Sequence, residues 1–122
     1  MTKNTEIVRK LLVKEKGKYP TDEYLRTPLH HAAFDQNLRV CELLIKHFKD
    51  VSPKDKYDMT PLHFAAQAGH VEVVTFLLNK VRTINVDPIS TLGFTPLMKS
   101  AIQGRIKCSK LLLISGKHNE RY

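Results

Sequence analysis

Thr60-Pro61-Leu62-His63-Phe64-Ala65-Ala66 is the most informative part of the sequence, because the 122-residue chain carries a version of it three times. The other copies span Thr27–Ala33 and Thr95–Ala101, so successive copies begin 33 and 35 residues apart. An apolar run follows each copy at the same distance, as in Phe76-Leu77-Leu78. A repeat of this period indicates a stacked array of helical units, and arrays of this kind usually work by presenting a surface.

The phrase and its period resemble the ankyrin repeat, whose unit is a β-turn followed by two antiparallel helices. The middle copy, from Asp55 to Lys80, also has Gly69-His70 between its two expected helices, as the family does. The resemblance implies an all-α fold: an ankyrin-repeat α-solenoid of helix-turn-helix units joined by β-hairpin-like turns.

The residues favour the same architecture on physical grounds. Each proline of the phrase, such as Pro61, stands where a helix begins and needs no N–H, and the preceding threonine is a natural N-cap. Small residues such as Ala65 and Ala66 let neighbouring first helices approach closely. Val71, Val74, Leu77 and Leu78 recur at helical spacing in the second helix. This apolar face is too small to stand alone, so each unit must pack on the next.

We expect one domain over residues 1–122. Its parts are a half repeat (1–18), repeat 1 (22–50), repeat 2 (55–81), repeat 3 (90–116) and a tail (117–122). The half repeat is expected because Glu6–Leu12 aligns with the second helix of the middle unit. The apolar run Leu111–Ile114, with no polar helix after it, favours a piece or short isoform of a longer array; terminal helices that cap the stack are the alternative.

The turns depart from the family pattern in two places. The tip residue that is usually glycine is Leu25 in the first unit, Asp58 in the second and Gly93 in the third. Leucine adopts a positive φ poorly, so an irregular first turn is expected. Residues 81–90 lengthen the connection before the third unit by two residues, and we expect a harmless bulge, with a binding finger as the alternative.

Histidine and cysteine invite a search for a reactive site, and neither supplies one. The family resemblance implies that His30 and His63 hydrogen-bond the backbone of adjoining turns. Met98 replaces this histidine in the third unit, so a looser junction is expected there. Cys41 and Cys108 lie two helix layers apart, too far for a disulfide, and are expected to be buried free thiols. With no metal-ligand spacing, nucleophile elbow or phosphate loop, we predict no enzyme, no cofactor and no metal.

The remaining expectation is a non-catalytic protein–protein interaction module or adaptor that binds a partner on the concave face of the array. In the family, turn tips and exposed sides of first helices bind partners, and the matching positions here form what we call the stripe. The stripe comprises Glu23, Tyr24, Arg26, Phe34, Asp35, Lys56, Tyr57, Met59, Gln67, Ala68, Thr91, Leu92, Phe94, Ile102 and Gln103.

Aromatic residues, methionine and arginine are prominent in this set, and such side chains often carry interface energy. The protein-binding residues that we predict are Tyr24, Arg26, Phe34, Lys56, Tyr57, Met59, Phe94 and Ile102. The alternative is that the rings merely cover helix ends within the stack.

Charge and hydropathy limit the classes of partner and the cellular locations that we expect. The net charge is +8, with +3 in residues 1–26 and +5 in residues 95–122. Arg105, Lys107, Lys110, Lys117, Lys99 and Arg121 are candidates for a basic patch. We expect a protein partner, and the positive charge favours an acidic one. We also expect the chain itself to be a monomer. The alternatives are a basic module for nucleic acid or anionic membrane surface, and the ankyrin portion of a larger enzyme or channel. No apolar run approaches a membrane span and no signal peptide is evident, so a cytoplasmic or nuclear location is expected.

Overall fold

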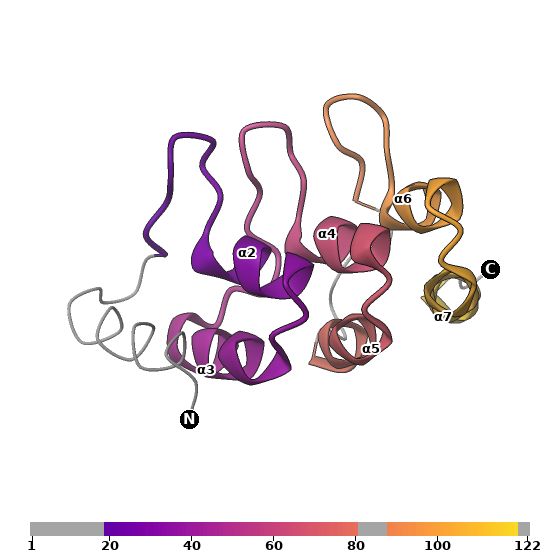
Figure 1. Cartoon of the computed structure of the whole chain (residues 1–122), viewed down its shortest axis with the longest axis horizontal. Helices are drawn as coiled ribbons and strands as arrows, with labels where there is room; N and C mark the ends of the chain where they lie inside the picture. Colours follow the sequence, from indigo (N-terminus) through magenta and orange to yellow (C-terminus); the bar gives the residue numbers. More distant parts are fainter. Residues whose placement is uncertain (1–18, 81–87, 120–122) are drawn as a thin grey trace.

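The helices form two parallel rows in the computed structural model, which describes residues 19–80 and 88–119 (Figure 1). The first row contains α2 (Pro28–Phe34), α4 (Pro61–Ala68) and α6 (Pro96–Ile102). The second row contains α3 (Leu38–Phe48), α5 (Val71–Lys80) and α7 (Ile106–Asn119). Three hairpins project side by side beyond the first row, one before each first helix (Figure 1). The predicted all-α repeat architecture is therefore confirmed.

The first helices begin where the repeated phrase predicts. Thr27, Thr60 and Thr95 are the N-caps, with proline at the first helical position each time. In α4 the Thr60 hydroxyl accepts a hydrogen bond from the backbone N–H of His63, and the His63 ring accepts one from the backbone N–H of Thr60. The histidine thus does the work that Glu or Gln does in an ordinary capping box.

The core lies between the two rows and between neighbouring units. Leu29, Leu44, Leu62 and Leu77 are each at most 1% exposed. Ala33 and Ala66 are fully buried, because α2 packs on α4 and α4 packs on α6. The predicted close approach of first helices at the small residues is confirmed. Since neighbouring units pack on each other through both rows of helices, the array is stabilised through successive interfaces.

Each hairpin closes in the same way. The backbone N–H groups of Asp22, Asp55 and Ser90 donate to the carbonyls four residues later, at 3.1, 3.0 and 2.9 Å. The tip residues Leu25, Asp58 and Gly93 all have positive φ, at 59°, 59° and 85°. The prediction of an irregular first turn is wrong, because Leu25 adopts the left-handed conformation that the hairpin requires despite its side chain.

Hydrogen bonds at equivalent positions join one unit to the next. The N–H of Lys56 donates to the carbonyl of Tyr24, and that of Thr91 donates to the carbonyl of Tyr57, both at 2.8 Å. At the far end of the first helices, the His70 ring donates to the Phe34 carbonyl at 2.7 Å. Arg105 Nε donates to the Gln67 carbonyl at 3.1 Å. These bonds fix the hairpins and first helices in register along the array.

Two of the predicted boundaries need comment. Helix α7 continues to Asn119 and so enters the predicted tail (117–122), because Gly116 does not end the helix. The half repeat (1–18) lies outside the described residues, as does most of the lengthened connection (81–87).

Candidate protein-binding surface

The stripe residues at the hairpin tips are exposed and repeat from unit to unit. Tyr24, Tyr57 and Leu92 occupy one equivalent position and are 40%, 40% and 78% exposed. The hydrogen bonds from Lys56 and Thr91 hold the backbone at the first two of these positions. The three exposed residues therefore stand at equivalent positions of successive hairpins, and we call them the tip column.

Further predicted residues extend this surface onto the first helices. Phe34 at the end of α2 is 48% exposed, and Ile102 at the end of α6 is 63% exposed. Lys56 is exposed beside Tyr57. Phe94 is only partly buried, but Lys99 Nζ lies 4.2 Å from its ring centroid. A partner that contacts the Phe94 ring must therefore displace or accommodate Lys99.

Met59 does not belong to the exposed surface. It is only 8% exposed, so the prediction that Met59 lies exposed on the stripe is wrong. Its backbone N–H donates to Asp55 Oδ1 at 2.8 Å, and its carbonyl accepts from the His30 ring. These bonds hold Met59 at the closed base of the second hairpin, where its side chain is turned inward.

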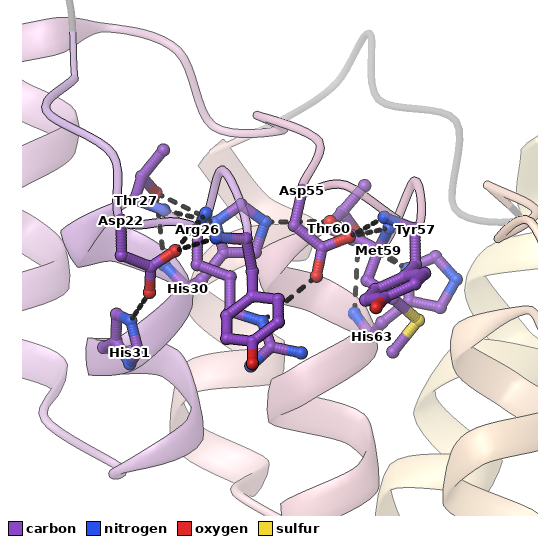
Figure 2. A network of polar contacts seen from close by, with 11 residues as sticks. Asp22, Arg26, Thr27, His30, His31, Asp55, Tyr57, Met59, Thr60 and His63 are labelled. Atoms are coloured by element: carbon purple, nitrogen blue, oxygen red, sulfur yellow. Dashed lines mark hydrogen bonds and ion pairs between the residues drawn. The ribbon is translucent and has the colours of Figure 1, made fainter.

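Arg26 and Asp55 link the first two hairpins (Figure 2). Arg26 Nε lies 3.3 Å from Asp55 Oδ2, and the Asp55 side chain is fully buried. Asp55 Oδ1 accepts from the N–H groups of Tyr57 and Met59, both at 2.8 Å. The Arg26 guanidinium carbon lies 5.1 Å from the ring centroid of Tyr24 and 5.3 Å from that of Phe64. Arg26 is thus both exposed in part and fixed in orientation by three neighbours.

His30 and His63, the histidines of the repeated phrase, have a structural role, as the family resemblance implied. The His30 ring accepts from the Thr27 N–H through Nδ1 at 3.0 Å and donates from Nε2 to the Met59 carbonyl at 2.8 Å. His63 makes the same pair of bonds, with Phe94 as the acceptor at 2.8 Å. Burial lowers the pKa of both rings, although the carbonyls that they face oppose this shift. Both histidine side chains are therefore expected to be uncharged and to link neighbouring units through their hydrogen bonds.

A pocket that the sequence analysis did not predict opens beside Arg26. It has a volume of about 280 Å³ and is lined by Arg26, His30, His31, Phe34 and Phe64. The edge of Phe34 faces the ring of Phe64, with centroids 6.2 Å apart. One signal was present in the sequence: Asp22 and Asp55 each stand five residues before the N-cap threonine of their unit. This recurrence could have indicated that charged side chains meet at these turns. Nothing in the sequence indicated that Phe64 and His31 join them.

Other chemistry-bearing residues are dispersed. In the part of the chain that the structure describes, no group of His, Cys, Asp and Glu could hold a metal ion. Cys41 and Cys108 are buried free thiols, and burial raises the pKa of Cys41 to about 12. Within residues 19–80 and 88–119, no helix is both long and apolar enough to cross a membrane.

The predicted basic patch is only partly assembled. Lys107 and Lys110 are exposed on α7. Lys99 instead lies over Phe94, and Arg105 binds the end of α4. The side chains of Lys117 and Arg121 lie outside the described ones.

The sequence also matches a known protein family. A family model described as ankyrin repeats (3 copies) matches residues 1–89 and, in a second match, residues 49–121. Together the two matches span nearly the whole chain, in agreement with the helix pairs and hairpins of the structure. Proteins built from such repeats are generally protein–protein interaction modules and are typically not catalysts. The chain is a member of the ankyrin repeat family.

Proposed function

We propose that this chain is a non-catalytic adaptor that binds a protein partner along the stripe. The observation that carries the proposal is the tip column: Tyr24, Tyr57 and Leu92 are exposed at equivalent positions, on hairpins held in register by backbone hydrogen bonds. Large, partly rigid side chains on a fixed backbone lose little conformational entropy on binding, which favours their use as interface anchors.

Partial exposure of the rings also bears on the alternative that they cover helix ends. Tyr24, Tyr57 and Phe34 are each at least 40% exposed, so much of their surface is available to a partner. A side chain that served only to cover the stack would be expected to lose most of its exposure. The large exposed fraction of these three residues therefore supports partner binding at their positions.

The test compares the partners of three folded chains. The first is the wild type, and the second is a tip-column triple variant (Tyr24→Ala, Tyr57→Ala, Leu92→Ala). The third is a back-face triple variant (Arg39→Ala, Glu72→Ala, Lys107→Ala), which changes one exposed, equivalent position per unit on the second helices. Circular dichroism first establishes that all three are folded. We expect proximity labelling in cells to lose partners from the tip-column variant only. Loss from the back-face variant alone would place the binding site on the other row.

The adaptor role, a cytoplasmic or nuclear location and a monomeric state belong to the same proposal. Two buried free thiols are typical of a reducing compartment. The same labelling experiment, read by microscopy, gives the compartment. Light scattering of the purified chain gives the oligomeric state.

A further inference from the structure

The pocket beside Arg26 combines a fixed cation with apolar walls. We call it the Arg26 pocket, and its lining is Arg26, His30, His31, Phe34 and Phe64. Phe34 and Phe64 stand edge to face, with their planes 89° apart. The two rings form apolar wall, while the guanidinium supplies the charge.

The nearby carboxylates are already engaged. Asp55 is fully buried and binds two backbone N–H groups and Arg26 Nε. Asp22 Oδ1 accepts from the N–H groups of Tyr24 and Arg26, and its Oδ2 lies 3.0 Å from His31 Nε2. Asp55 thus pairs with Arg26 through Nε, and neither of these two carboxylates has a hydrogen bond to the Nη groups of Arg26.

The outer edge of the guanidinium is the unsatisfied part of the pocket. Among the described residues, the Arg26 side chain bonds only through Nε, and 32% of its surface is exposed. Its two Nη groups have no hydrogen-bond partner among the described residues, and they are open to solvent or to a ligand. A purely apolar ligand would shield these groups from water without replacing their hydrogen bonds, which is unfavourable. A carboxylate replaces both bonds at once, because its two oxygens match the fork of a guanidinium.

We propose that the Arg26 pocket receives an Asp or Glu side chain of a protein partner, whose carboxylate binds the two Nη groups of Arg26, while a neighbouring apolar side chain packs on Phe34. This inference rests on the proposed function, since it names the chemistry of one position within the stripe. It also gives a local reason for an acidic partner, in addition to the net charge of +8.

The test selects ligands without knowledge of the natural partner. A phage library of random linear peptides is selected on the folded full-length chain, and recovered peptides are synthesised for fluorescence anisotropy. We expect them to carry Asp or Glu beside an apolar residue. Arg26→Gln should weaken their binding roughly tenfold or more. Arg105→Gln removes the same charge outside the pocket and should change the affinity much less.

A double-mutant cycle gives the sharper readout. Replacement of the peptide's acid by its amide should cost about as much as Arg26→Gln, and the two losses should not add, because each removes the same contact. Full additivity of the two losses would overturn the proposal.

A second pair of variants leaves the Arg26–Asp55 bond intact, in case Arg26→Gln unfolds the first hairpin. Phe34→Glu and Phe34→Gln remove the same exposed ring, but only the former adds a negative charge at the pocket rim. We expect Phe34→Glu to weaken binding several-fold more than Phe34→Gln. Equal losses would contradict an acidic ligand.

The selection also separates the two proposals. Peptides that depend on Tyr57 and Leu92 but carry no acid, and that tolerate Arg26→Gln, would refute the pocket and leave the stripe standing. Failure to recover any peptide that depends on a stripe residue would contradict both.

Discussion

Leu25 holds a backbone conformation that glycine provides at the same place in the third hairpin, with a φ of 59° against 85° for Gly93. A left-handed conformation costs a residue with a Cβ roughly 1–2 kcal/mol. Because the Leu25 side chain is 52% exposed, little apolar burial offsets this cost. The hairpin hydrogen bonds of Asp22 keep the conformation in place.

We therefore predict that Leu25→Gly stabilises the protein. Relief of the strain exceeds the added entropy of glycine in the unfolded chain, so the free energy of unfolding should rise by about 0.5–1 kcal/mol. Urea denaturation followed by circular dichroism measures this difference. Asp58→Gly is the control and should gain less, because Asp tolerates the left-handed region better than Leu. A loss of stability in Leu25→Gly would show that the side chain packs usefully.

Buried neutral histidines make the stability depend on pH. The pKa of His30 and His63 is lowered in the folded state, first by burial, below the ordinary value of 6.5. As the pH falls through about 6.5, the unfolded chain binds protons that the folded chain does not, so the free energy of unfolding decreases.

Denaturation curves between about pH 7.5 and pH 5.5 test this sign. The wild type should lose stability over this range. His63→Gln, which keeps an N–H for the Phe94 carbonyl, should show a shallower slope. Stability that stays constant or rises toward pH 5.5 would mean that the rings are protonated in the native state.

At the level of the helix pairs, Arg105 packs against the C-terminal end of the first helix of the preceding unit. Arg105 Cδ would lie 2.6 Å from a Cβ at Gly69, and its Nε binds the Gln67 carbonyl at the C-terminal end of α4. Gly104 occupies the equivalent position in the third unit, has a similar positive φ and has no atom within 4 Å of such a Cβ. The two glycines thus share a positive φ, which would strain any residue with a Cβ, and they differ in what surrounds them.

Gly69→Ala should therefore be more destabilising than Gly104→Ala. Both pay for the strained backbone, whereas only Gly69→Ala displaces Arg105, and the difference should be about 1 kcal/mol. Thermal and urea unfolding of the two variants measure it. In an Arg105→Ala background the difference should largely vanish; a difference that persists would mean that another contact is responsible.

The sequence predicted the elements better than the contacts between them. The threonine-proline starts, the alanine contacts and the helix order follow from local chemistry and from the period of the repeat, and the structure confirms them. Leu25 was misjudged because a local preference yielded to hydrogen bonds that close the hairpin. Met59 was misjudged because burial begins at this residue, after the exposed Tyr57 and Asp58 and directly before the buried Thr60. The Arg26 pocket combines side chains from two units, and no spacing within one unit reveals it.

For the molecule as a whole, the reactivity of the two cysteine thiols measures how often each unit unfolds locally. Cys41 and Cys108 are both buried, and burial raises the pKa of each. Neighbouring positions differ: Ala33 is fully buried and Ile45 is 7% exposed in the first unit, whereas their equivalents Ala101 and Leu113 are exposed in the third. Fewer contacts cover the third unit, so it should open locally more often.

We predict that Cys108 reacts with iodoacetamide faster than Cys41 in the native protein, and that both react rapidly in urea. Mass spectrometry of timed, digested samples measures the two rates separately. Equal native rates would indicate that the units open together as one cooperative body.

In our proposal, the hairpin side of the array binds a protein. The most direct measurement is isothermal titration of one purified partner from the labelling experiment with the wild type, the tip-column triple variant and the back-face triple variant. We predict at least roughly tenfold weaker binding for the tip-column variant, as expected for loss of interface anchors, and nearly unchanged binding for the back-face variant. Weaker binding of the back-face variant, with the tip-column variant unaffected, would contradict it.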